Sequence, residues 1–304
     1  MDDRKSGSIF VLISATGLGT LGVLGKLAYG AGLTIVSVLA LRFIIGTIFF
    51  YVLLGLGNAR RREMNLSRPY NVGTNHAFLC LKGRSLAVAV GLGAVGYATM
   101  SGLFFWGLKF MSAGMVAIVF YTYPMFVVII STVVLKEKMT YYTTIALILT
   151  LVGVALITGF DVAYAYLLGV LIVLLAALVF STYVTVSRTL LGKVDAGVLT
   201  AYVLPFAAMT FLAYGIVTGQ LILPATLYGW SLAIALGVIA TAIPVFGFLI
   251  GLSRIGASRA SILSTLEPVV AVLLGAAFLG DPVTSTTILG GALVLAGTVL
   301  IHKQ

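Results

Sequence analysis

The sequence predicts an all-α polytopic membrane protein, in which ten transmembrane helices form two inverted repeats of five helices. Three observations predict this class. Hydrophobic residues make up 61% of the 304 residues and charged residues only 9%, whereas about a quarter of the residues of a soluble domain are charged. Apolar stretches run without interruption over the length of a spanning helix. Segments of the second half of the chain also match segments of the first half.

Ten stretches have the length, about 20 largely apolar residues, that a spanning helix needs. They cover residues 7–29, 34–56, 85–108, 112–135, 140–158, 165–187, 197–218, 227–252, 257–279 and 284–302. Their hydrophobicity is continuous rather than alternating, which excludes a β-barrel. The first stretch is too long for the apolar part of a signal peptide, so we expect it to be retained.

The basic residues predict how these spans are oriented. With the N-terminus inside, 15 of the 18 Lys and Arg residues fall on the inner side; Lys26 and Lys109 fall outside, and Arg42 lies within a span. An excess of Lys and Arg marks cytoplasmic loops. We therefore expect both termini in the cytoplasm and the chain in the inner (plasma) membrane. This rule accounts for the net charge of +10, so the lipid bilayer is an expected partner and nucleic acid is not.

An internal repeat relates two long segments at an offset of 144 residues. The matched positions include Ala113 with Ala257, Pro124 with Pro268, Leu135 with Leu279, Glu137 with Asp281, and Gly153 with Gly297. A weaker match relates the stretches that precede them, which predicts two five-helix units, residues 7–159 and 165–302. Because five is odd, the second unit must enter the membrane from the opposite side. Inverted repeats are typical of transporters, although a static membrane protein with two homologous halves is the alternative.

Motifs for other kinds of chemistry are missing from the sequence. Gly25-Lys26 is followed by Leu27, and the stretch lacks the glycine spacing of a phosphate-binding loop. The histidines, His76 and His302, lie in a predicted loop and at the C-terminal end, and Cys80 is the single cysteine. We therefore expect no enzyme activity, no metal and no cofactor. A channel would need a ring of like charges or a carbonyl filter, and neither is visible.

Two ionisable residues lie deep within predicted spans, where such groups are functional candidates. Glu267 lies near the middle of the ninth stretch, and Arg42 about a third of the way into the second stretch from outside. Glu267 could bind a substrate ammonium group, titrate as a proton-coupling site, or pair with Arg42. We interpret Arg42 as structural, because an arginine can bond carbonyl groups of neighbouring helices or extend toward the interface.

Aromatic residues gather near the two matched prolines. The candidate substrate-binding residues are Tyr97, Met100, Phe104, Tyr121, Tyr123, Tyr183 and Glu267. Tyrosine hydroxyls deep in a span need polar partners or water, which predicts a wet cavity. Residues two apart do not share a helix face, so we expect at least one, but not both, of Tyr121 and Tyr123 to point at the substrate. Pro124 and Pro268 each remove a backbone hydrogen bond, and we predict that they act as hinges.

The repeated motifs resemble those of a known family. They are Leu41-Arg42-Phe43, Ser112-Ala113, Leu135-Lys136-Glu137-Lys138, Gly256-Ala257, Glu267-Pro268 and Leu279-Gly280-Asp281. Over almost the whole chain they resemble the EamA-type branch of the drug/metabolite transporter superfamily, although Asp281-Pro282 departs from the usual Glu at that turn. The resemblance implies secondary transport and a substrate cavity among helices 1, 3, 4, 6, 8 and 9. The aromatic candidates look most like the YddG group of aromatic amino-acid exporters.

The resulting hypothesis is a transporter that exports neutral or aromatic amino acids or related small metabolites by alternating access. Protons are a candidate coupling partner, through Glu267. Two alternatives stay open: an exporter of another small metabolite or drug with the same fold, and a channel-like facilitator.

Overall fold

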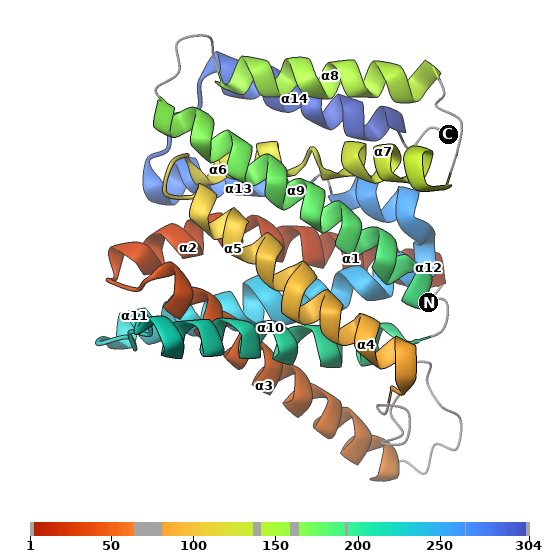
Figure 1. The fold of residues 1–304 in the computed structure, drawn as a ribbon, viewed down its shortest axis with the longest axis vertical. Coiled ribbons are helices and arrows are strands. Elements are labelled where there is room, and N and C mark those ends of the chain that lie inside the picture. The colour runs from red at the N-terminus through yellow and green to blue at the C-terminus, as the bar shows by residue number, and fades with distance from the viewer. Residues whose placement is uncertain are drawn as a thin grey trace.

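The computed structural model describes residues 3–63, 81–135, 141–158, 164–191, 194–264 and 266–301. Every regular element within these ranges is a helix, and the helices pack into one bundle (Figure 1). They are α1 (Asp3–Gly19), α2 (Leu21–Gly30), α3 (Ile35–Glu63), α4 (Gly83–Gly91), α5 (Ala98–Gly107), α6 (Ala113–Phe120), α7 (Tyr123–Leu135), α8 (Tyr141–Thr158), α9 (Tyr164–Leu191), α10 (Ala196–Thr218), α11 (Leu227–Gly237), α12 (Ile243–Ser264), α13 (Leu266–Leu279) and α14 (Ser285–Ile301).

The helices are those of a multi-pass membrane protein. In the part of the chain that the structure describes, six helical stretches are long and apolar enough to cross a membrane: Lys5–Gly30, Ile35–Leu56, Gly83–Gly107, Tyr166–Leu191, Ala196–Thr218 and Leu227–Ile255. Shorter apolar helices cover Ala113–Val127, Leu266–Leu279 and Ser285–Gly297. Large apolar side chains such as Leu56, Val217 and Leu227 are exposed on the outer surface, as lipid contact requires. The all-helical membrane class is thus confirmed, while the number of ten spans stays a prediction.

Two long spans contain short π-helical segments. Leu92–Tyr97 lies between α4 and α5, and Val238–Ala242 lies between α11 and α12. A π-helix bonds each N–H five residues back and is commonly found at functional sites. The first segment packs against α10 and the second against α3. Both segments therefore lie inside the bundle.

The two matched prolines lie in the first turns of helices, where a missing N–H is tolerated. Pro124 is the second residue of α7, and α6 ends at Phe120, four residues earlier. Tyr121 and Thr122 lie between these two helices, so the chain is interrupted before Pro124. Pro268 is the third residue of α13, and α12 ends at Ser264; residue 265 lies outside the described residues. The hinge role of both prolines stays a prediction.

The N-terminal and C-terminal parts of the chain are interleaved. The three most extensive pairings join α1 with α12, α8 with α14, and α3 with α10, and α6 also packs against α13. Figure 1 shows α8 and α14 together at one end of the bundle and α3 toward the other. Gly19 permits one close approach, because a Cβ atom there would lie only 2.8 Å from the carbonyl oxygen of Glu267. The absence of a side chain at Gly19 thus lets α1 pack closely against α13, which carries Glu267.

Candidate functional site

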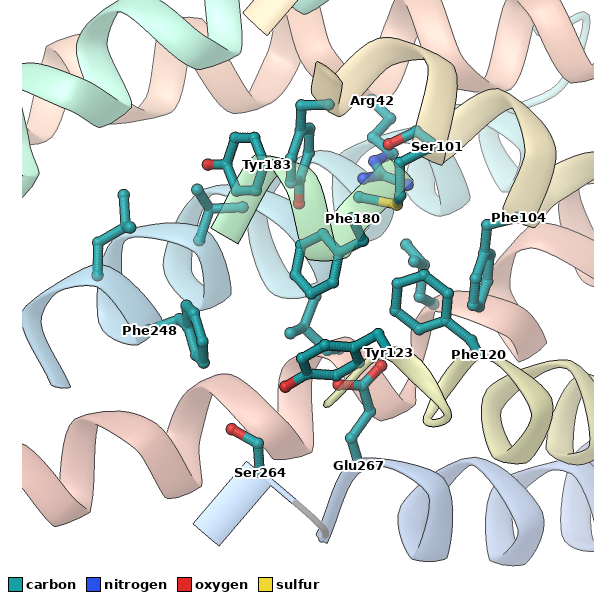
Figure 2. A pocket seen from close by; sticks show the side chains of 16 residues that line it. Arg42, Ser101, Phe104, Phe120, Tyr123, Phe180, Tyr183, Phe248, Ser264 and Glu267 are labelled. Carbon is teal, nitrogen blue, oxygen red and sulfur yellow. The ribbon is translucent and has the colours of Figure 1, made fainter. Parts of the chain in front are cut away.

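A central cavity lies where most of these helices meet (Figure 2). Its lining residues are Leu18, Leu21, Arg42, Tyr97, Met100, Ser101, Phe104, Phe120, Tyr123, Phe180, Tyr183, Val245, Phe248, Leu249, Ser264 and Glu267. The cavity has a volume of about 50 Å³. Since one water needs roughly 10–15 Å³, the cavity is narrow and has room for only a few waters. Its walls must move apart to admit a larger molecule.

Six of the seven candidate binding residues line this one cavity: Tyr97, Met100, Phe104, Tyr123, Tyr183 and Glu267. Tyr121 does not line it. Its side chain is fully buried, its ring centroid lies 5.4 Å from that of Tyr123, and the side chains of Tyr123 and Ser264 are its hydrogen-bond partners. Tyr121 therefore supports the cavity wall from behind. Whether any of these residues binds a substrate stays a prediction.

One helix face supplies three of the candidates. Tyr97 ends the π-helical segment, and Met100 and Phe104 follow on α5 at spacings of three and four residues. Residues three and four apart lie on the same side of a helix. Ser101, one residue after Met100, joins them at the cavity.

Matched residues next to the two prolines line the cavity. Tyr123 immediately precedes Pro124, and Glu267 immediately precedes Pro268. Both line the cavity, as do Phe120 and Ser264, at the ends of α6 and α12. Each pair is related by the offset of 144 residues. The position before the matched proline therefore contributes a polar side chain to the cavity in both halves of the chain.

Aromatic rings form a continuous wall. The ring centroid of Phe120 lies 5.3 Å from those of Phe104 and Phe180, and that of Phe180 lies 5.7 Å from that of Tyr183. The wall continues to Tyr97, 5.2 Å from Tyr183. Such spacings are favourable for aromatic pairs. Phe120, Phe180 and Phe248 were not among the residues predicted from the sequence. The spacing of three residues between Phe180 and Tyr183 could have indicated that Phe180 lies on the same helix face as Tyr183.

Charged and polar side chains lie at two sides of the cavity. Figure 2 shows Arg42 and Ser101 on one side, and Glu267 with Ser264 on the other. Within the described part of the chain no ion pair joins Arg42 to Glu267, so the pairing considered from the sequence is not formed. The exposed fraction of Glu267 is 7% and that of Arg42 is 1%. Arg42 is also part of the cavity wall, which the sequence interpretation of a purely structural arginine did not anticipate.

Arg42 has a largely aromatic environment. Its Cζ atom lies 4.5 Å from the ring centroid of Phe43 and 5.2 Å from that of Phe105, within the range of cation–π contacts. The Tyr97 side chain is a hydrogen-bond partner. The Nε and Nη1 atoms are buried and have no hydrogen-bond partner among the described residues. The guanidinium is thus held in place but only partly satisfied.

Other residues singled out in the sequence fall outside this site. His76, Cys80, Glu137 and His302 lie outside the described residues. Across the ranges that the structure describes, no three His, Cys, Asp or Glu residues come close enough to hold a metal ion. The central cavity is therefore the candidate functional site.

Apolar spanning helices around a central, largely aromatic cavity define a multi-pass membrane protein with an internal small-molecule site. Comparison with known proteins gives the family. The model of the EamA-like transporter family matches residues 5–159 and 167–302, so the chain belongs to this family of the drug/metabolite transporter superfamily, whose name indicates transporters. The resemblance to the EamA-type branch is confirmed, while the likeness to the YddG group stays a prediction.

Similar proteins agree with this placement. An uncharacterized transporter of Archaeoglobus fulgidus is 26% identical, over 88% of this chain and 89% of its own. A probable terminal-alkyne amino-acid exporter of Streptantibioticus cattleyicolor is 25% identical, over 73% of this chain and 75% of its own. A crystal structure with 21% identity matches with a TM-score of 0.69, over 98% of this chain and 96% of that chain, which shows a shared fold. The family match and the two named relatives support a transporter of small metabolites.

Proposed function

We propose that this transporter exports neutral or aromatic amino acids, or closely related metabolites, by alternating access. The observation that carries this proposal is the aromatic wall of the central cavity, with polar groups on two sides of it. Flat rings offer apolar contact to a ring or an alkyl chain, and a few polar groups orient the ligand. The aromatic wall supports a likeness to the YddG group. The S. cattleyicolor relative, named as an amino-acid exporter, supports the same substrate class.

Two inverted five-helix units, 7–159 and 165–302, are the proposed basis of alternating access. The separate family matches to residues 5–159 and 167–302 support this division. So does the matched pair Tyr123 and Glu267, each placed immediately before a proline in the first turn of a helix. Inverted units can exchange inner and outer openings around a central site. Pro124 and Pro268 are the proposed hinges, because a proline leaves the carbonyl four residues before it without its helical hydrogen bond.

The proposed location is the plasma membrane, with both termini in the cytoplasm. The distribution of Lys and Arg supports it. A membrane-impermeant thiol reagent tests this orientation at Cys80, which is the only cysteine. We expect labelling only after the cells are opened. Labelling in intact cells would reverse the orientation.

Reconstitution into proteoliposomes tests the proposed activity. Vesicles loaded with unlabelled phenylalanine, tryptophan, leucine or threonine are placed in trace labelled amino acid, with and without a pH gradient. We expect saturable exchange of the labelled amino acid for the internal one. Uptake that is linear in concentration and independent of internal substrate would favour a channel-like facilitator. Exchange that appears only with other metabolites would favour the alternative substrate class, and a response to the pH gradient would support proton coupling through Glu267.

A further inference from the structure

We propose that Arg42 and Ser101 form a carboxylate-binding site in the cavity wall, so that substrates carry one carboxylate at the end of an apolar or aromatic body. This inference rests on the proposed transport function and names the group by which the substrate is recognised. It departs from the reading of Arg42 as a structural residue. The observations that support it are two buried side chains on the same side of the same cavity, each with donor atoms that lack a hydrogen-bond partner among the described residues.

Arg42 is a buried cation whose charge is not neutralised. The side chain is 1% exposed and lines the cavity. Among the described residues it has no acidic partner, and its Nε and Nη1 atoms lack hydrogen-bond partners. A guanidinium keeps its charge under all physiological conditions, and an uncompensated buried charge is strongly unfavourable. Cation–π contacts with Phe43 and Phe105 offset part of that cost, but they leave the in-plane N–H groups unused.

Ser101 is the second donor. Its Oγ atom is buried and also lacks a partner among the residues that the structure describes. Ser101 and Phe105 are four residues apart on α5 and therefore share a face. Because the ring of Phe105 lies against the Arg42 guanidinium, that shared face is turned toward Arg42. Figure 2 shows both side chains on one side of the cavity.

The chemistry of these donors fits a carboxylate. An arginine N–H group forms a strong, charge-assisted bond to a carboxylate oxygen; here Nε or Nη1 can donate it, and the serine hydroxyl can add another bond. Among the described lining residues Arg42 is the single basic side chain. One cation neutralises one negative charge, so the site matches a carboxylate, whereas a phosphate dianion would need further basic groups. Glu267, on the opposite side, repels an anion. The carboxylate is therefore directed to Arg42, and the rest of the ligand lies on the aromatic wall.

Three ligands with the same ring separate this proposal from its alternatives. Phenylalanine has both charged groups, phenylpropanoate lacks the ammonium group, and phenethylamine lacks the carboxylate. In the wild-type protein we expect phenylalanine and phenylpropanoate to compete for the site. Phenethylamine should compete at least about tenfold more weakly, because it cannot form the hydrogen bonds to the charged guanidinium. Equal competition by phenethylamine would overturn the proposal.

Two variants locate the site. Ser101→Ala removes one unpartnered hydroxyl from the cavity wall, and we expect it to weaken both carboxylates about tenfold without weakening phenethylamine. The matched control is Thr47→Val, which removes another unpartnered buried hydroxyl on α3, outside the cavity lining. Arg42→Gln should abolish the preference for carboxylates; if that variant does not fold, Ser101→Ala still decides. Two outcomes would overturn the proposal. In the first, Ser101→Ala and Thr47→Val change ligand affinity equally. In the second, Ser101→Ala weakens the binding of all three ligands equally. Either result would show that these donors are satisfied by water or protein.

The two proposals fail separately. If phenylalanine is exchanged across the membrane but phenethylamine competes equally, amino-acid transport stands and the carboxylate site falls. If phenylalanine is not transported but phenylpropanoate binds in a manner that depends on Ser101, the carboxylate site stands and the amino-acid assignment falls.

Discussion

Asp281 accepts a hydrogen bond from the backbone N–H of Ala113, with 3.1 Å between Oδ2 and the nitrogen, across 168 residues of chain. Ala113 is the first residue of α6, and Asp281 follows α13. The Ser112 hydroxyl bonds the N–H of Met115 at the same helix end. A carboxylate at a helix N-terminus also interacts favourably with the helix dipole. This bond therefore ties the end of α13 to the start of α6.

Replacing Asp281 should loosen this link. We expect Asp281→Ala to lower the free energy of unfolding by about 1 kcal/mol, the usual cost of losing a capping acceptor. Thermal unfolding in detergent micelles measures the change. The control is Asp195→Ala, because Asp195 precedes α10 but makes no side-chain capping bond. Equal destabilisation by the two substitutions would mean that the Ala113 bond adds nothing beyond general charge effects.

Gly19 should tolerate no larger side chain. A Cβ atom there would lie 2.7 Å from Val270 and 2.8 Å from the carbonyl oxygen of Glu267. We expect Gly19→Ala to destabilise the protein by about 1–3 kcal/mol through overpacking, and to reduce transport by displacing α13. Gly55→Ala is the control, since nothing lies within 4 Å of a Cβ atom at that position of α3; it should be neutral or stabilising by up to about 1 kcal/mol. A stable and fully active Gly19→Ala protein would argue against the tight packing of α1 on α13.

Tyr123 should matter most for bulky substrates. Its ring contacts Phe120 and Phe180 in the aromatic wall, so its loss removes apolar contact that only a large ligand uses. We expect Tyr123→Ala to raise the KM for phenylalanine by about tenfold, equivalent to one aromatic contact, and the KM for threonine by much less. Tyr214→Ala, at an exposed position of α10, should change neither. Equal loss for both substrates at normal expression would remove the basis for the aromatic assignment.

Glu267 should determine how transport depends on pH. Among the described lining residues it is the one carboxylate, while tyrosine and arginine side chains keep their protonation states well into alkaline solution. We expect wild-type exchange to change between about pH 5 and pH 8, and Glu267→Gln, which keeps the shape but cannot titrate, to show a flatter profile. Initial exchange rates at each pH provide the measurement. Superimposable profiles for the two proteins would leave Glu267 with a packing role.

The parts of this structure that sequence could predict are those that follow from local pattern. Uninterrupted apolar stretches predicted helices because a lipid-facing segment must satisfy its own backbone hydrogen bonds. The spacing of Tyr97, Met100 and Phe104 placed them on one face, and the separation of Tyr121 from Tyr123 implied that the two would not point together. The cavity lies among the predicted helices, with Arg42 added from α3.

The remaining features depend on contacts between segments far apart in the chain. Phe180 and Phe248 are ordinary among 17 phenylalanines in apolar helices, and only packing turns them inward. Arg42 could be recognised as a cavity residue only from the packing of α3, because the sequence alone does not show which face of that helix is turned inward. The interruption of the helix at Tyr121 and Thr122 could not be predicted from Pro124 alone, because a proline is compatible with both a kink and a helix start.

The π-helical segment Leu92–Tyr97 has a consequence for how homologous sequences are aligned. A π turn holds about one residue more than an α turn, so every side chain after it is rotated by about 100° relative to an uninterrupted α-helix. Met100, Ser101 and Phe104 all follow the segment. A homologue that lacked this one inserted residue would present a different set of side chains to the cavity, even if its residues in α5 were identical. A single-residue deletion within Leu92–Tyr97 is therefore expected to change which side chains of α5 face the cavity while every residue of α5 stays the same.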